Sequence, residues 1–318
     1  MKTTPIVLCP VDFSEASLGA LRYGAAIAEH FRAEVVVLTV EDPLLTEARD
    51  LGTGIVWDPE EARKETRKFA SKVFGPILPA GVRVRYEVAV GKPPTEILRM
   101  SKVSHCDLIV MSTHGVTGMR KLFFGSTTER VLRDTTVPVL ATPPSDPGPI
   151  ALSEARAFLR RMLVPIDLSR ESMHQVQVAR ALSEALKLPL IALHVVEPIR
   201  SPLAAKWLNP HIELERKTRA EDAMEELLAT LPRQLHPESL VAYGDPAEEI
   251  AKLARDRQTG LIVIGLHGSP MLGPRMGSVT YRVLCLAHAL ILALPPSTMS
   301  GGAHVTTDAM AARPVVHQ

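Results

Sequence analysis

The chain has few aromatic residues, few cysteines and almost no net charge. Phe, Trp and Tyr make up only 4% of its 318 residues, which argues against the aromatic stacking platforms that bind single-stranded nucleic acid. Lys plus Arg number 36 and Asp plus Glu number 35, so a net charge of +1 provides no general attraction to nucleic acid or to an anionic membrane. The three cysteines lack CxxC spacing, which argues against a disulfide scaffold or a cysteine zinc site.

Long apolar runs are missing as well. The longest, from Val283 to Leu294, is too short to cross a bilayer and contains His288. The first residues reach Asp12 and Glu15 before any apolar stretch of signal-peptide length. We therefore expect a cytoplasmic protein with no membrane partner. With 46% hydrophobic and 22% charged residues the chain is expected to fold, and its length favours two domains of about 150 residues each.

The chain contains a tandem repeat with an offset of 152 to 155 residues. The segment PVDFS at 10–14 recurs as PIDLS at 165–169, GKPPTEI at 91–97 recurs as GDPAEEI at 244–250, and Gly125-Ser126 recurs as Gly277-Ser278. The Pro-rich stretch at 143–149 can form neither a helix nor an inner strand. We expect a first domain at 1–143, a linker and lead-in at 144–159, a second domain at 160–296 and a disordered tail at 297–318.

Strands and helices alternate in each repeat. The first repeat is expected to have strands at 6–11, 34–40, 82–88, 107–111 and 138–142, with helices at 15–31, 59–74, 95–103 and 126–134. Ser14 is placed to cap the first helix, and Ser153 to cap a short helix at 153–161. The order predicts an α/β fold, with one doubly wound five-stranded parallel sheet in each of two tandem domains. Ligands of such sheets bind at the carboxyl ends of the strands.

A glycine-containing loop joins a strand end to a helix start in each repeat. The first reads Ser112-Thr113-His114-Gly115, then nine residues, then Gly125-Ser126; the second reads Gly265-Leu266-His267-Gly268, then eight residues, then Gly277-Ser278. Glycines permit positive φ and close approach of a ligand, and the N–H groups of a helix start attract anions. The pattern predicts a phosphate cradle, in which Ser126 donates a hydroxyl and also caps its helix.

These segments together resemble the universal stress protein family, in particular its tandem two-domain members. The family's ATP-binding pattern is Gly, two residues, Gly, nine residues, Gly, then Ser or Thr. The resemblance covers about residues 3–143 and 160–296. It implies an adenine-nucleotide α-hydrolase-like fold and a stress-response regulatory protein that binds ATP or AMP, with Mg²⁺ accompanying a triphosphate.

The resemblance also implies the site residues. Beside the adenosine it places Pro10, Asp12 and Val40 in the first repeat, and Pro165, Asp167 and Val195 in the second. Along the phosphates it places Ser112, His114, Gly115, Gly125, Ser126 and Thr127, and in the second repeat Gly265, Gly268, Gly277, Ser278 and Val279. Both loops depart from the pattern, because Ser112 replaces the first glycine and the second loop is one residue short with Pro270 and Pro274. We expect the first loop to be the more intact.

Other interpretations stay open at this point. Asp12 and Asp167 also fit as residues that close a strand-to-helix turn, and His114 fits as a solvated loop histidine. A slow ATPase on the same site and a ligand-free dimerising module are the alternative functions; no catalytic residue and no metal ligand is predicted. The resemblance further implies that 137–142 pairs with 289–294 within the chain, and that two chains form a homodimer.

Overall fold

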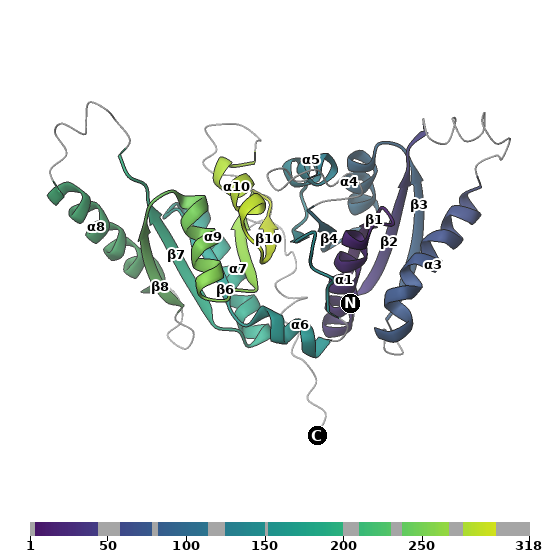
Figure 1. The fold of residues 1–318 in the computed structure, drawn as a ribbon, viewed down its shortest axis with the longest axis horizontal. Coiled ribbons are helices and arrows are strands. Elements are labelled where there is room, and N and C mark those ends of the chain that lie inside the picture. The colour runs from purple at the N-terminus through teal and green to yellow at the C-terminus, as the bar shows by residue number, and fades with distance from the viewer. Residues whose placement is uncertain are drawn as a thin grey trace, which may run out of the picture.

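The structure, a computed structural model, describes residues 4–43, 58–77, 82–113, 125–149, 152–199, 210–229, 237–266 and 276–296. Its strands form one sheet in the order β3-β2-β1-β4-β5-β10-β9-β6-β7-β8. The strands are β1 (Ile6–Val11), β2 (Glu34–Glu41), β3 (Val84–Val90), β4 (Leu108–Ser112), β5 (Val139–Thr142), β6 (Met162–Ile166), β7 (Leu190–Val196), β8 (Glu238–Tyr243), β9 (Leu261–Gly265) and β10 (Leu290–Leu294). The expected α/β fold, with five parallel strands in each repeat, is confirmed, and Figure 1 shows the two halves splayed from a central seam.

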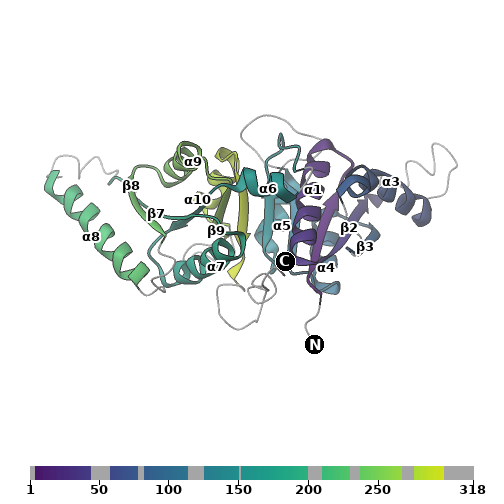
Figure 2. The same cartoon turned by 90° about the horizontal axis from the view of Figure 1, so that it is seen from below.

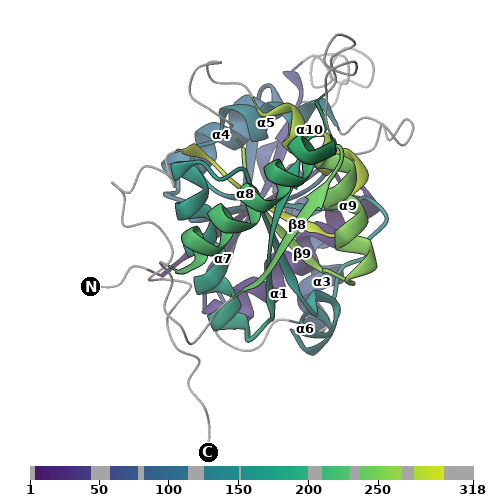
Figure 3. The same ribbon diagram turned by 90° about the vertical axis from the view of Figure 1, so that its left-hand side faces the viewer.

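Helices cover both faces of the sheet, as a doubly wound fold requires. They are α1 (Glu15–Phe31), α3 (Pro59–Ile77), α4 (Pro93–Val103), α5 (Ser126–Asp134), α6 (Leu152–Leu159), α7 (Arg170–Leu186), α8 (Pro210–Ala229), α9 (Pro246–Asp256) and α10 (Ser278–Leu286). One apolar core packs α1, α3, α7 and α8 on one face, and a second packs α4, α5, α9 and α10 on the other. Figure 3 shows this for the second repeat, with α7 and α8 on one side of β8 and α9 on the other. Within the described ranges, no helix is both long and apolar enough to cross a membrane.

Burial explains where each strand lies. The central strand β4 is buried at every position, which its unbroken apolar run predicts for a strand covered on both faces. The expected edge strand is confirmed as β3, two residues later than predicted, and Ala89 is the one buried residue among its seven. Ser14 caps α1 as expected, because its hydroxyl oxygen accepts from the N–H of Ser17 at 3.1 Å. The cap predicted at Ser153 is wrong, since α6 begins at Leu152 and Ser153 already lies inside its first turn.

The two repeats meet through their last strands. β5 and β10 pair antiparallel, with Leu140 opposite Leu292, so the expected pairing within the chain is confirmed. The other strand pairs of the described chain are parallel. The seam therefore makes one continuous sheet of both repeats. The division into domains at 144–159, and the disordered tail at 297–318, stay predictions; the tail lies outside the described residues.

The connector between the repeats docks on α1. The hydroxyl of Tyr23 donates to a carboxylate oxygen of Asp146 at 2.7 Å, and Arg22 donates to the carbonyl oxygen of Pro147 at 2.6 Å. Burial, together with the Asp146 carboxylate, raises the pKa of Tyr23 far above its ordinary value. Next along the chain, α6 lies between the two halves, as Figure 2 shows from below. The connector is thus fixed against α1 of the first repeat before the chain enters α6.

Candidate functional site

The central strands of each repeat separate toward their carboxyl ends. In the first repeat β1 and β4 pair only near their beginnings, where Val7 and Leu8 lie opposite Leu108 and Ile109. The second repeat repeats this, with pairing of β6 to β9 only at Met162 and Leu163. Chain order reverses direction across the sheet at these strands, which is the topological switch point where open α/β sheets bind ligands.

Asp12 directly follows β1 at this point. Its Oδ1 accepts hydrogen bonds from the N–H of Ser14 at 3.1 Å and from the Ser14 hydroxyl at 2.5 Å, and the side chain is exposed. Phe13 between them has a left-handed backbone with φ of 63°, uncommon for a bulky residue. Asp12 therefore closes a tight strand-to-helix turn. Its place beside an adenosine stays a prediction.

Asp167 closes the same turn in the second repeat, with Leu168 at φ 60°. Its Oδ1 accepts from the N–H of Ser169 at 3.0 Å, from the Ser169 hydroxyl at 2.6 Å and from the Ser172 hydroxyl. Partial burial alone would raise the pKa of Asp167, but the hydrogen bonds from Ser169 and Ser172 outweigh it and lower the pKa. The carboxylate is thus held in its charged form at the strand end.

Aliphatic side chains flank these carboxylates. Val40 near the end of β2 pairs with Ala89, and Val195 near the end of β7 pairs with Ala242. Both valines are partly buried and pack on the core that carries α4, α5, α9 and α10. Pro10 and Pro165 lie within β1 and β6 and are also partly buried. In each repeat the residues predicted for adenosine therefore lie on adjacent strands of the same sheet edge.

Hydrogen bonds pin both ends of each glycine-containing loop. The N–H of Gly125 donates to the carbonyl oxygen of Thr113 at 2.8 Å, and the Thr128 hydroxyl donates to the carbonyl oxygen of Ser112 at 2.9 Å. The same bonds run in the second repeat from Gly277 to Leu266 at 2.9 Å, and from Thr280 to Gly265 at 2.8 Å.

These bonds hold the start of the following helix beside the strand end. Sequence reasoning missed Thr128 and Thr280, although a Thr two residues after both Gly-Ser pairs was a visible signal.

Glycine is the N-cap of both helices. Gly125 has φ −60° and Gly277 has φ −59°, and neither position has a side-chain cap hydrogen bond among the described residues. The prediction that Ser126 caps α5 is wrong, because Ser126 is already the first helical residue and a cap precedes it. Positive φ is not what these two positions require. The missing side chain instead leaves the first-turn N–H groups of α5 and α10 without a capping side chain at the N-cap position.

Some of the remaining predicted site residues lie in the described part of the chain and others lie outside it. Ser112 is buried and extended within β4, so it fits where the family pattern has glycine. Ser126 and Ser278 are exposed on the first turns of α5 and α10, beside the partly buried Thr127 and Val279. His114, Gly115 and Gly268 lie outside the described residues. Gly265 ends β9.

A buried amide distinguishes the second repeat. The side chain of Gln175 donates to the carbonyl oxygens of Pro165 at 2.7 Å and Val263 at 2.9 Å, and accepts from the N–H of Gly265 at 3.1 Å. It thereby bridges β6 and β9 where they stop pairing. The equivalent position in the first repeat is Ala20, which provides no such bridge. Sequence reasoning did not single out Gln175.

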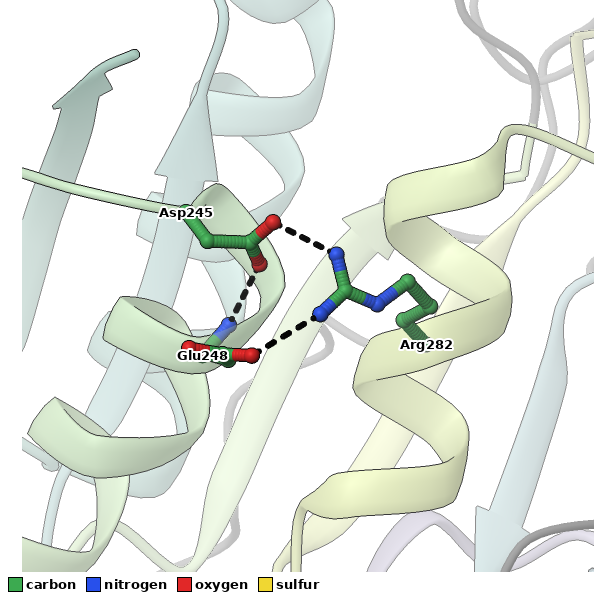
Figure 4. A network of polar contacts seen from close by, with 3 residues as sticks. All are labelled: Asp245, Glu248 and Arg282. Carbon is green, nitrogen blue, oxygen red and sulfur yellow. Dashed lines mark hydrogen bonds and ion pairs between the residues drawn. The ribbon is translucent and has the colours of Figure 1, made fainter. Parts of the chain in front are cut away.

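Charge next to the helix starts also differs between the repeats. Arg282 of α10 donates to Asp245 at 2.6 Å and to Glu248 at 3.2 Å, and Asp245 caps α9 by accepting from the N–H of Glu248 (Figure 4). The hydrogen bond from Arg282 lowers the pKa of Asp245. The equivalent residues of the first repeat are Lys92, Thr95 and Arg130.

These substitutions change the sign of the local charge. Lys92 makes no side-chain cap bond, and no ion pair of Lys92 or Arg130 occurs among the described residues. In the second repeat the formal charges of Asp245, Glu248 and Arg282 add up to −1. At the equivalent positions of the first repeat there are two cations, and their charges add up to +2. Where the structure describes the chain, no group of three or more His, Cys, Asp or Glu residues is arranged to hold a metal ion.

Fold and site together define a class of protein. It is a tandem α/β protein in which two open parallel half-sheets join through their last strands, and each carries a pinned helix start at its carboxyl edge. The sequence profile of the Universal stress protein family matches residues 4–143 and 159–294, so the chain belongs to that family.

Individual relatives agree with this assignment. A universal stress protein of Methanocaldococcus jannaschii is 31% identical over 141 residues, which are 42% of this chain and 79% of that protein. The universal stress protein YxiE of Bacillus subtilis is 30% identical over 142 residues, covering 42% of this chain and 95% of that protein. A solved universal stress protein from Archaeoglobus fulgidus shares the fold at a TM-score of 0.62 and 20% identity, covering 92% of this chain and 99% of its own.

Proposed function

We propose that this protein is a stress-response regulator that binds an adenine nucleotide, ATP or AMP, at the carboxyl ends of its strands. One observation carries the proposal. Both repeats hold an uncapped helix start beside a strand end with the same two hydrogen bonds, from Gly125 and Thr128 in one repeat and from Gly277 and Thr280 in the other. A duplicated turn that served only packing would gain from a capping side chain, whereas an anion site needs free N–H groups.

The surrounding groups suit the rest of a nucleotide. In each repeat an aliphatic residue, Val40 or Val195, lies near the end of the neighbouring strand and provides an apolar surface for adenine. The carboxylates of Asp12 and Asp167 follow the central strand and can accept hydrogen bonds from a ribose hydroxyl. No step of this binding needs a net positive protein, because oriented N–H groups supply the local charge.

Mg²⁺ enters this proposal only with a triphosphate. A hard cation of this kind keeps several waters and takes one or two carboxylates together with phosphate oxygens. Asp12 is exposed at the strand end and is the described carboxylate of the first repeat placed for such a role. The ion would neutralise phosphate charge there; the chain itself supplies the helix start and the turn.

The first repeat is proposed as the stronger site for ATP. Arg130 lies five residues after the N-cap Gly125, which is about 7.5 Å along the helix axis and within a Debye length at physiological salt. In the second repeat Arg282 is at the same position but is paired with Asp245 and Glu248. Polyphosphate is therefore attracted by the first repeat and repelled by the two carboxylates of the second.

The test begins with the purified protein, which is heated so that any bound adenine nucleotide is released and identified by chromatography. Calorimetric titration with ATP and with AMP then follows for the wild type and for Gly125→Asp and Gly277→Asp, which put a negative charge at each helix start. Val103→Asp is the control, because Val103 is 63% exposed at the far end of α4. If the wild-type protein releases no adenine nucleotide on heating and binds neither added ATP nor added AMP, the proposal is contradicted.

The proposal extends to location and assembly. We place the protein in the cytoplasm and propose that two chains form a homodimer. Since β5 and β10 already pair with one another, the dimer must use another surface. Light scattering of the purified chain checks the mass, and a monomer at all concentrations contradicts this part alone.

A further inference from the structure

A second pocket lies at the other end of the second repeat, away from the proposed nucleotide site. It occupies about 330 Å³ where α6, α9 and α10 end and β9 and β10 begin. Its polar lining includes Arg160, Arg255, His288 and Thr259, and its apolar lining includes Phe158 and Leu286. This size falls within the range of pockets that bind small molecules.

The charged lining is of one sign. None of the described residues that line the pocket is acidic, while Arg160, Arg255 and His288 are basic. Arg160 donates to the Gln258 side chain at 2.6 Å, and the ion-pair partner of Arg255 among the described residues is Asp256 of its own helix, at 3.7 Å. A guanidinium has five N–H donors, so both arginines keep donors for an incoming oxyanion.

Cations at these helix ends also complement the partial negative charge of the terminal carbonyl groups. That role does not account for Thr259. Thr259 is only 7% exposed, and its hydroxyl has no hydrogen-bond partner within the described structure. A buried unpaired hydroxyl is costly, and the equivalent residue of the first repeat is Cys106, which does not need a partner. The second repeat therefore has a polar group here that its own fold does not satisfy.

The pocket was not inherited from the duplication. In the first repeat the equivalent of Gly260 is Asp107, whose carboxylate accepts from the N–H of Ile6 at 2.8 Å. A side chain at Gly260 would meet the carbonyl oxygen of Phe158 at 2.4 Å and the Cα of Leu159 at 2.5 Å. Glycine therefore lets the end of α6 seat against β9 and form one wall.

Two further exchanges alter the charge of the same place. Leu286 stands where the first repeat has Asp134, and His288 stands where it has Thr136. Together with Gly260 in place of Asp107, the second repeat has lost two carboxylates at this end of the sheet and gained a histidine. Its exposed apolar side chains, Phe158 at 41% and Leu286 at 37%, lie on the same pocket.

We propose that this pocket binds a small organic oxyanion, a carboxylate or a phosphate monoester carried on an apolar body. Arg160 and Arg255 hold the oxyanion, the Thr259 hydroxyl donates a further hydrogen bond, and Phe158 and Leu286 contact the apolar body. The site does not depend on nucleotide binding, because it lies at the opposite ends of the strands and on residues that the nucleotide site does not use.

The test is calorimetric titration of the full chain with benzoate and with phenyl phosphate, and with benzyl alcohol as the uncharged probe. We expect saturable binding of at least one of the two anions, none of benzyl alcohol, and no displacement by saturating ATP. The benzoate and phenyl phosphate arms decide between carboxylate and phosphate. Absence of saturable binding of both anions, or displacement by ATP, overturns the proposal.

Matched variants localise the binding. Arg160→Gln and Arg255→Gln should each weaken it about tenfold, the expected loss of a charged hydrogen bond. Lys102→Gln is the control. Lys102 is the first-repeat equivalent of Arg255, so this substitution removes the same positive charge away from the pocket. An equal effect of all three variants would show a general charge effect and overturn the proposal.

Thr259→Val keeps the shape of the side chain and removes the unpaired hydroxyl. We expect its melting temperature to equal or exceed that of the wild type, while anion affinity falls. Wild-type affinity in this variant would overturn the assignment of the Thr259 hydroxyl to the ligand.

Discussion

Thr128 donates its hydroxyl hydrogen to the carbonyl oxygen of Ser112 at 2.9 Å, across a loop that separates a strand from a helix. Both residues are buried, at 3% and 8% exposure, so the bond is shielded from water. The same bond recurs between Thr280 and Gly265. It holds each helix start next to the strand end and thereby sets where an anion would meet the chain.

Replacing Thr128 by Val should destabilise the protein by about 1–2 kcal/mol, because the carbonyl oxygen of Ser112 loses its donor in a buried place. Urea unfolding measures this change. Thr280→Val is the matched variant and should cost a similar amount. If neither variant lowers the free energy of unfolding, the two hydrogen bonds do not hold the helix starts.

Asp167→Asn should lower stability at neutral pH by no more than about 1 kcal/mol, because the charged carboxylate accepts three hydrogen bonds but is partly exposed. The folded pKa of Asp167 is lowered, so its stabilisation is fully present above the unfolded pKa of about 3.9 and is lost as pH falls through the folded value. The difference between variant and wild type should shrink accordingly.

Urea unfolding at several pH values between neutral and strongly acid checks this profile. Ser172→Ala removes one of the donors and should weaken the pH dependence without abolishing it. Parallel stability curves for wild type and Asp167→Asn would contradict the assignment.

Leu292→Ala should cost about 2–5 kcal/mol, since Leu292 is 5% exposed and lies opposite Leu140 at the seam. The control is Leu214→Ala on α8, where the leucine is 64% exposed and little apolar burial is lost. Thermal or urea unfolding measures both. Equal effects would mean that the seam contributes no more than the surface.

Charge exchange should shift ATP affinity between the repeats. With the second site blocked by Gly277→Asp, Arg130→Gln should weaken ATP binding several-fold, by a change that diminishes as salt is added. With the first site blocked by Gly125→Asp, Glu248→Lys should strengthen it. Calorimetry at low and high salt measures both. If neither substitution changes the affinity for ATP, the proposal that the two sites are unequal is contradicted, whereas the proposal of nucleotide binding itself is not.

Gly260→Ala should destabilise the protein by about 1–3 kcal/mol, because the new methyl group would press on Phe158 and Leu159 of α6. The end of α6 must shift, so anion binding at the pocket of the second repeat should be lost as well. Far-ultraviolet circular dichroism and titration with phenyl phosphate check the two effects separately. If Gly260→Ala is as stable as the wild type, the end of α6 can shift without loss of free energy and the tight contact at Gly260 is not required.

Much of the fold could be predicted because its signals are local. Continuous apolar runs predicted the buried strands, and Ser14 marked the start of α1. The site was harder. The recurrence of Thr128 as Thr280 was visible in the sequence, but its hydrogen bond could not be predicted, since its partner Ser112 lies sixteen residues away across the loop. The prediction that Ser126 caps α5 was wrong because the helix begins at Ser126 itself, one residue earlier than such a cap requires, with Gly125 as its N-cap.

The duplication, the alternation of strands and helices, and the resemblance to a family could all be inferred from the amino-acid sequence alone. These depend on residues close together or on direct comparison of one half with the other. The structural differences between the two halves could not be inferred in this way, because they depend on the folded chain. Arg282 pairs with Asp245 and Glu248, Gln175 bridges two strands, and Gly260 admits the end of α6. Each is a contact between segments far apart in the chain, whose geometry exists only once the sheet has formed.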